Sequence, residues 1–386
     1  MSELRADSLS NESSTGGPVL SGITEFSGQQ YFIPPRGTTA ERPSDCPPGS
    51  IRFNTDSAHL EYWNGVSWLE FEATNVEMGD SVTAPLFATG DSGGIGHRGV
   101  FMGGHNEPPS TVYNIMDYIS IENLGNAIDF GDLHGGSEQE GGALSSSIRG
   151  YHFGGDPADN EIKTFVFAST GSSTDYGDLT GSSKHGAGCS DGTRGVVSLS
   201  SPSSNLVMNY FHLSSTGTAQ SFGNLSVAAA FTSALSSPTR GVWGGGNNPS
   251  VHNTIQYITI STTGNSIVFG ELTQARYGLS AASNATRGIF AGGYYPSSRT
   301  NVMDYITIAS TGNAIDFGDL TQKRFYSSAV SSPTRFVIGG GAEGSGPFAN
   351  KIEFTQFATT GNVADFGDLT QPRRHLDACS NGHGGL

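Results

Sequence analysis

A unit of 45 to 51 residues recurs along residues 98–386, and this repeat constrains the fold more than any other feature of the sequence. Each copy begins near an Arg–Gly pair, or Arg–Phe in the last copy, and ends near an aromatic–Gly pair. The arginines are Arg98, Arg149, Arg194, Arg240, Arg287 and Arg335, which lie 51, 45, 46, 47 and 48 residues apart. Periods of about 40–50 residues made of short β runs and glycine turns are typical of propeller blades. The sequence therefore predicts an all-β fold, with a six-bladed β-propeller over residues 98–386.

The fifth copy illustrates how one blade is built. Residues 286–291 are a short β run that ends at a glycine pair, and residues 302–308 and 314–317 have the composition of further strands. One blade cannot cover both of its faces, so it must stack on its neighbours. Two aromatic series are expected to fill the space between blades. One is Phe130, Tyr176, Phe222, Phe269, Phe317 and Phe366, and the other is Tyr118, Phe165, Tyr210, Tyr257, Tyr305 and Phe354.

Closure of the predicted ring needs pairing between distant parts of the repeat region. Its last β run, residues 376–380, is followed by no further Arg–Gly strand. The strand that begins at Arg98 would therefore have to lie beside this last run.

The first 97 residues differ in character from the repeats. Residues 1–48 are predicted to be an extended, Pro-rich anchoring arm, residues 49–75 a small β-hairpin module, and residues 76–97 a linker. Asn64–Gly65 between two alternating aromatic runs is a strong signal for a two-residue hairpin.

Composition excludes several classes of protein. The chain has 19 Lys+Arg against 35 Asp+Glu, a net charge of −16, which disfavours binding to nucleic acid. Cys46, Cys189 and Cys379 are too few and odd in number to indicate a disulfide framework. The sequence has no run of about 20 apolar residues, so membrane insertion is not predicted. Residues 1–20 lack the features of a secretory signal.

Motifs that carry chemistry are mostly missing, so the chain is predicted not to be an enzyme, with no catalytic residues, cofactor or metal. The string Asp-Phe-Gly recurs as a blade turn, without the other kinase motifs. The recurrent Asp132, Asp178, Asp319 and Asp368 could bind calcium but fit turn residues better. The ten histidines show no metal-binding spacing along the sequence.

The variable loops that follow the glycine pairs are the candidate ligand-binding elements. They are expected on one face of the ring, because binding residues are often held on loops above a rigid scaffold. Solvated loops without a ligand are the alternative. The candidates are His105, Asn106 and Glu107 in the first copy, Asn247 and His252 in the fourth, and Tyr294, Tyr295 and Arg299 in the fifth.

The paired-glycine run followed by an aromatic strand resembles the blades of kelch-type and galactose-oxidase-like propellers. This likeness covers about three quarters of the chain, although the tryptophan that kelch repeats carry late in each blade is missing. A copper site like that of galactose oxidase is not expected, because Cys189 and Cys379 lie in predicted strands.

Three segments resemble structural proteins of tailed bacteriophages, especially cyanophages. They are residues 4–13, residues 49–71 with the strings Gly-Ser-Ile-Arg-Phe-Asn-Thr-Asp and Leu-Glu-Tyr-Trp-Asn-Gly, and residues 305–314. The resemblance implies a virion protein that is made in the host cytoplasm. It also implies that the N-terminal section, including Leu4, Trp63 and Trp68, attaches to other tail or capsid proteins while the propeller faces outward.

This resemblance suggests a tail fibre or particle appendage that binds a glycan or protein on the host surface. Such proteins are often homo-oligomers, although no coiled-coil heptads are present here to drive assembly. One alternative is a purely architectural capsid decoration, knob or tail adaptor. Another is a polysaccharide depolymerase, which would need two carboxylates at glycosidase spacing on one face.

Overall fold

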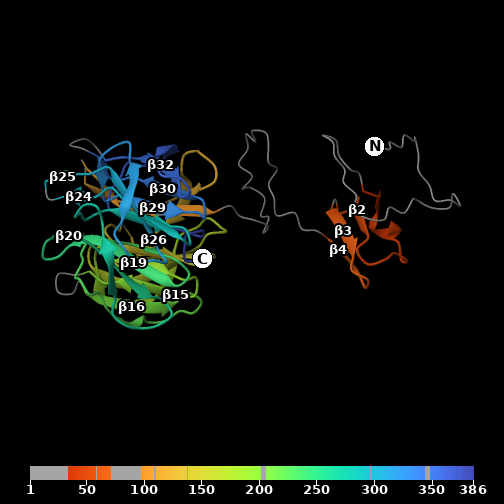
Figure 1. Ribbon diagram of the computed structural model, residues 1–386, viewed down its shortest axis with the longest axis horizontal. Helices are drawn as coiled ribbons and strands as arrows, with labels where there is room; N and C mark the ends of the chain where they lie inside the picture. The colour runs from red at the N-terminus through yellow and green to blue at the C-terminus, as the bar shows by residue number, and fades with distance from the viewer. Residues whose placement is uncertain are drawn as a thin grey trace. The chain divides into compact units, whose positions relative to one another are not determined.

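The computed structural model describes residues 34–57, 59–70, 97–107, 110–136, 138–200, 206–295, 297–343 and 348–386. The chain divides into two compact units, Met1–Gly94 and Ile95–Leu386 (Figure 1). Strands and one short 3-10 helix are the only regular elements in these described ranges, which confirms the all-β class. Leu4, residues 1–33 of the predicted arm and residues 76–96 of the predicted linker lie outside the described residues.

The described part of the first unit, residues 34–57 and 59–70, contains one four-stranded sheet. Its order is β1 (Arg36–Gly37), β2 (Ile51–Asn54), β3 (His59–Trp63) and β4 (Trp68–Glu70), with the 3-10 helix η1 (Thr39–Glu41) between β1 and β2. β3 and β4 form the hairpin expected around Asn64–Gly65, and Trp63 pairs with Trp68 across it. β1 belongs to the predicted arm but pairs with β2, so the sheet begins earlier in the chain than the predicted hairpin module.

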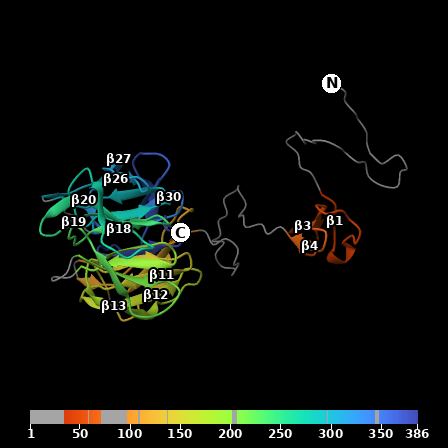
Figure 2. The same cartoon turned by 60° about the horizontal axis from the view of Figure 1, so that its bottom comes forward.

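The described part of the second unit contains six four-stranded antiparallel sheets (Figure 2). We call the first strand of each sheet the inner strand. The inner strands are β10 (Gly142–Ser145), β14 (Ala187–Ser190), β18 (Ser233–Ser236), β22 (Ser280–Ser283), β29 (Ser328–Ser331) and β34 (Asp377–Ser380).

The other strands of these sheets follow in a fixed order. The second strands are β5 (Arg98–Met102), β11 (Arg149–Phe153), β15 (Arg194–Ser198), β19 (Arg240–Asn247), β23 (Arg287–Ala291) and β30 (Arg335–Gly339). The third strands are β8 (Ile115–Ser120), β12 (Asp159–Val166), β16 (Val207–His212), β20 (Val251–Thr259), β26 (Val302–Thr307) and β32 (Lys351–Gln356). The fourth strands are β9 (Ile128–Asp132), β13 (Thr174–Ser183), β17 (Gln220–Asn224), β21 (Ile267–Glu271), β27 (Ile315–Asp319) and β33 (Ala364–Asp368). Short two-stranded pairs are β6 (His105–Asn106) with β7 (Thr111–Val112), β24 (Tyr294–Tyr295) with β25 (Ser298–Arg299), and β28 (Arg324–Phe325) with β31 (Ala342–Glu343).

The inner strands contact one another in chain order, and β34 contacts β10 to complete the cycle. β34 also pairs with β5 in antiparallel register, with Cys379 opposite Val100. The last β run therefore shares a sheet with the strand that begins at Arg98, as the sequence predicted. Small residues dominate the inner strands, and close approach between neighbouring strands requires such residues.

A ring of serine hydroxyls ties the inner strands together at one end. Each inner strand ends in a serine, and five of these hydroxyls donate to the carbonyl oxygen of the preceding serine in the ring. The donors are Ser145, Ser190, Ser283, Ser331 and Ser380, at Oγ–O distances of 2.5 to 2.8 Å. Ser236 instead lies 3.5 Å from Nδ1 of His383, in the segment that follows β34. His383 Nε2 lies 3.0 Å from the Ser145 carbonyl oxygen, so this segment covers the serine end of the inner strands.

Aromatic residues at the outer part of each sheet pack as the sequence predicted, with one correction. The Phe317 series is buried throughout, and Tyr305 meets Phe317 edge-on at 5.9 Å between ring centroids. In the second sheet, however, Thr164 lies opposite Tyr151, where the first sheet has Tyr118 opposite Val100. Thr164 therefore occupies the Tyr305 position there, and the assignment of Phe165 to that series was wrong by one residue.

The repeated arginine makes a contact between neighbouring sheets, and the sequence analysis did not identify this role. The Arg287 guanidinium lies 4.5 Å from the ring centroid of Tyr305 in its own sheet. It also donates a hydrogen bond to the carbonyl oxygen of Phe357 in the next sheet. Arg194, Arg240 and Arg335 make equivalent pairs of contacts. The arginine thus explains why the aromatic position and the Arg–Gly position recur together.

Replacing Gly318 by Ala is expected to destabilise the second unit by about 2–4 kcal/mol. Its φ is +146°, and a Cβ there would lie 2.4 Å from the carbonyl oxygen of Gly361 in the next sheet. Thermal unfolding of the purified chain measures the effect. Gly181→Ala is the matched control, because its Cβ would meet only Leu199 Cδ1 at 3.9 Å. Equal melting temperatures for the two variants would contradict a close approach of neighbouring sheets at Gly318.

Candidate functional site

Six equivalent positions converge at the end of the inner strands opposite the serine ring. Each lies two residues before an inner strand, and each has left-handed backbone with φ between 53° and 63°. We call these residues the mouth ring: Glu140, His185, Phe231, Gly278, Tyr326 and His375. Their backbones are linked around the ring, because the N–H of Tyr326 donates to the Gly278 oxygen and that of His375 to the Tyr326 oxygen, both at 2.9 Å.

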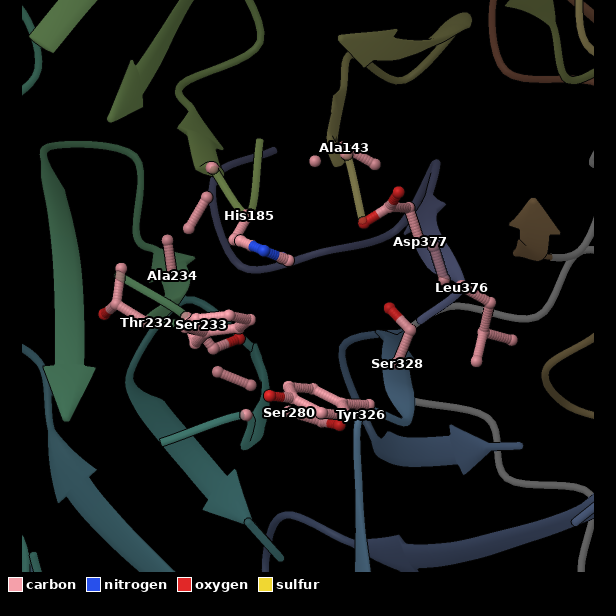
Figure 3. A pocket seen from close by; sticks show the side chains of 18 of the residues that line it. Ala143, His185, Thr232, Ser233, Ala234, Ser280, Tyr326, Ser328, Leu376 and Asp377 are labelled. Atoms are coloured by element: carbon pink, nitrogen blue, oxygen red, sulfur yellow. The ribbon is translucent and has the colours of Figure 1, made fainter. Parts of the chain in front are cut away.

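A cavity of about 120 Å³ opens at this end of the inner strands. The mouth ring and the first residues of all six inner strands line it, among them Ser280, Ser328 and Asp377. In Figure 3, His185, Tyr326 and Asp377 come from three different copies of the repeat and border the same space. The cavity is thus small and polar at its walls, with the larger side chains gathered at its rim.

Aromatic side chains form most of that rim. His185 stacks on Phe231, and His375 stacks on Tyr326, each with 3.7 Å between ring centroids. Phe231 and Tyr326 lie 5.5 Å apart across Gly278. Glycine is needed between them, because a Cβ at this position would lie 2.7 Å from Cε1 of Tyr326. The missing side chain lets the two aromatic pairs meet in one continuous surface.

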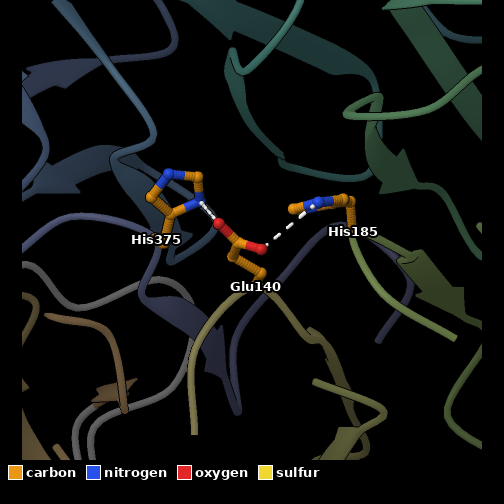
Figure 4. A group of neighbouring side chains, drawn as sticks. All are labelled: Glu140, His185 and His375. Carbon is orange, nitrogen blue, oxygen red and sulfur yellow. Dashed lines mark ion pairs between the residues drawn. The ribbon is translucent and has the colours of Figure 1, made fainter. Parts of the chain in front are cut away.

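The remaining member of the mouth ring, Glu140, lies between the two histidines (Figure 4). Its Oε1 is 3.1 Å from Nδ1 of His375, and its Oε2 is 3.3 Å from Nε2 of His185. Burial lowers the pKa of His185 to about 3 and that of His375 to about 2, so both imidazoles are neutral at pH 7. Their contacts to Glu140 are therefore not ion pairs at that pH. Lys184 supplies the positive charge, with Nζ 2.9 Å from Glu140 Oε2.

Three of the residues predicted in the first and fifth copies, His105, Tyr294 and Arg299, lie at the same rim. His105 is buried and stacks on His375 with ring centroids 5.2 Å apart. Tyr294 packs on Tyr277, 5.5 Å away, and Tyr277 in turn packs on Tyr326. Arg299 lies 4.9 Å from the ring centroid of Phe325, which packs against both Tyr294 and Tyr326. The structure thus connects three of the predicted residues to the mouth ring.

The other predicted loop residues are less directly connected to the mouth ring. The Asn247 N–H donates to Ala230, next to Phe231, while the His252 ring lies 3.2 Å from the Ala228 carbonyl oxygen. Asn106 is partly buried, whereas Glu107 and Tyr295 are exposed. In the first unit, Trp63 and Trp68 pack on each other with ring centroids 5.7 Å apart.

The Glu140, His185 and His375 group was missed by the sequence analysis. A search for spacing within one segment cannot find it, because the three residues come from three different copies of the repeat. Aligning the copies on their inner strands would have placed all six mouth-ring residues in one column. The positive φ at this column gives no sequence signal, since only one of the six residues is glycine.

Comparisons with known proteins assign no family to this chain. No protein-family model matches it, and no curated protein is significantly similar to it. Within the described ranges, no helix combines the length and apolar character needed to cross a membrane. All three cysteines are free thiols.

Proposed function

We propose that Ile95–Leu386 is a six-bladed β-propeller displayed on a tailed-bacteriophage particle, and that its mouth-ring end binds a glycan on the host surface. Six four-stranded sheets whose inner strands contact one another in a cycle support the propeller. Pairing of β34 with β5 supports closure of the ring by strands from its two ends. The phage assignment rests on the resemblance of residues 4–13, 49–71 and 305–314 to phage structural proteins.

The observation that carries the binding proposal is a continuous series of aromatic side chains beside a polar cavity. Phe231, Tyr277, Tyr294, Phe325 and Tyr326 form a connected series of ring contacts. Aromatic faces pack against the apolar faces of sugar rings, while polar groups beside them bond the hydroxyls. Arg299 and Tyr295 stand on the short β24–β25 pair at this rim, and Tyr295 is exposed. Such a surface suits a neutral or acidic polysaccharide.

The first unit is proposed to attach the protein to other virion proteins, with Trp63 and Trp68 among the contact residues. Several copies on one particle would then engage a surface polymer together. Linked sites gain avidity of about 10²–10⁴ over a single site when they bind simultaneously. Weak binding by each propeller, without catalysis, would be sufficient for attachment to a host.

Binding to bacterial surface polysaccharides is the direct test. The full chain is expected to bind at least one member of an array of capsular and lipopolysaccharide glycans. Arg299→Ala and Tyr295→Ala should each weaken that binding about tenfold, which corresponds to about 1.4 kcal/mol. Ile267→Ala, on an exposed residue of the outer strand β21, is the matched control and should bind normally.

Other outcomes separate the alternatives. If the full chain binds no glycan, and a virion lacking residues 98–386 assembles poorly, the propeller is architectural. If such a virion assembles but fails to adsorb, host attachment is supported. Release of new reducing ends from a bound polysaccharide would instead show a depolymerase, for which Glu140 and Asp377 are the carboxylates lining the cavity.

A further inference from the structure

We propose that Glu140, His185 and His375 form a binding site for a single transition-metal dication of the zinc type. The site lies in the mouth ring and uses one carboxylate and two imidazoles from the first, second and last copies of the repeat, whose inner strands β34, β10 and β14 contact one another in turn. It goes beyond glycan attachment and does not depend on it, because the metal alone is the ligand.

The separations between the donor atoms suit such an ion. The Glu140 oxygens lie 3.1 Å from Nδ1 of His375 and 3.3 Å from Nε2 of His185. Zinc bonds of about 2.0–2.1 Å in tetrahedral geometry place neighbouring ligand atoms about 3.4 Å apart. Each residue offers one donor atom, and these three atoms all lie within 4.8 Å of one another.

The backbone holds the three residues in place before any ion binds. The His185 N–H donates to the Glu140 carbonyl oxygen at 2.5 Å, and the Glu140 N–H donates to that of His375 at 3.0 Å. Stacking fixes the imidazole planes, with Phe231 against His185 and Tyr326 against His375. Ligands held in this way lose little freedom when they bind an ion, and this preorganisation favours affinity.

Lys184 both supports and limits the site. Its Nζ lies 2.9 Å from Glu140 Oε2 and 3.0 Å from Asp156 Oδ2, so it can orient the carboxylate. Partners outside the ligand set commonly orient ligating carboxylates in this way. Its positive charge also repels a dication, which lowers the affinity. Removing this charge while keeping a hydrogen-bond donor should therefore strengthen binding.

The donor set selects the class of ion. Two imidazole nitrogens and one carboxylate oxygen suit zinc and its first-row neighbours, whereas calcium takes six to eight oxygens and magnesium an octahedron of oxygens. Three protein ligands leave at least one position of a four-coordinate zinc ion for water or another molecule. We propose zinc as the ion that binds here. Cobalt can replace zinc in the experiment because its visible spectrum reports the ligands.

Titration of the chelator-treated full chain with zinc chloride tests the inference. Calorimetry should give one ion per chain with a micromolar or lower dissociation constant, and cobalt should give the visible bands of a low-coordinate site with nitrogen ligands. Glu140→Gln and His185→Ala should each weaken binding at least tenfold, while Lys184→Gln should tighten it. His134→Gln, an exposed histidine 3.7 Å from Glu161, should bind as the parent does.

Three results would overturn the inference. One is the absence of zinc binding at 100-fold excess over the protein. Another is binding that Glu140→Gln and His185→Ala leave unchanged, because the ion then lies elsewhere. The third is a visible spectrum of the cobalt-loaded parent chain that is typical of an octahedral ion with six oxygen ligands. If circular dichroism shows that a variant is unfolded, zinc binding by His185→Gln is measured instead. The cobalt spectrum of the parent chain then serves as the second test, because it needs no variant.

Discussion

Replacing Asp304 by Ala is expected to lower the stability of the second unit by about 3–5 kcal/mol, because a buried arginine then loses its counter-ion. Arg276 and Asp304 are fully buried, with Nη2 of Arg276 3.0 Å from Oδ2 of Asp304. Burial lowers the pKa of Arg276, and two of its guanidinium nitrogens, Nε and Nη1, have no hydrogen-bond partner among the described residues. Asp304 also accepts hydrogen bonds from the N–H and hydroxyl of Thr273, so Ala would leave further donors unpaired.

The same contact recurs between other neighbouring sheets. Each pair joins the residue two positions before the mouth ring to the third strand of the next sheet. Arg324 pairs with Glu353 at 2.9 Å, and Arg373 with Asp117 at 3.0 Å. At the equivalent place between the first two sheets the charges are exchanged, with Lys163 on the strand and Glu138 in the loop, 3.1 Å apart. In these four copies the paired charges are opposite, in either order. The other two copies have uncharged residues at the equivalent positions, Ser183 with Asn209 and Ala229 with Gln256, so a charged pair is not required in every copy.

A melting temperature lowered by about 10 °C would agree with the expected loss for Asp304→Ala, at roughly 2–4 °C per kcal/mol. The control is the double variant Arg276→Met with Asp304→Leu, which removes both charges. Apolar replacement of a buried pair is often neutral or stabilising, so most of the stability should return. If the single and double variants melt together, the loss comes from packing and not from an uncompensated charge.

Much of the strand arrangement could be predicted from the sequence because the same residues recur at fixed places in each copy of the repeat. An arginine begins each second strand, followed by glycine in five of the six, and the aromatic–Gly pair lies in each fourth strand, so both series locate elements in every copy. The prediction for the second copy was wrong because it chose Phe165. The residue equivalent to Tyr118 is Thr164, one position earlier in the chain. One residue of slip places a side chain on the opposite face of a strand, and here the aromatic residue stands beside the equivalent position instead of at it.

The candidate site was only partly predictable, for a different physical reason. Loop residues such as His105 and Tyr294 stood out because they are large or polar in variable segments. Glu140 and His375 are separated by most of the repeat region and meet only because the inner strands lie side by side. No local spacing encodes such a meeting, so the cluster follows from the closure of the sheets rather than from any motif.

Deleting residues 377–386 is expected to abolish cooperative unfolding of the second unit. The deletion removes β34, whose four residues pair with Gly99 to Met102 of β5. β5 is buried along its whole length, so its backbone groups would lose partners in an apolar setting. Each such unsatisfied group costs about 1–3 kcal/mol, and several together equal the 5–15 kcal/mol that stabilises a typical domain. Scanning calorimetry on the purified chain should show no transition for this unit.

Truncation after Asn381 separates loss of the strand from loss of the covering segment. It keeps β34 and the hydrogen bond from the Arg98 N–H to Asn381 Oδ1, but removes His383 from the serine ring. This shorter deletion should lower the melting temperature while leaving one cooperative transition, because the β34–β5 pairing remains. Cooperative unfolding of the 377–386 deletion at the midpoint of the full chain would mean that β5 does not depend on β34. The ring would then be held by the contacts between its other inner strands alone.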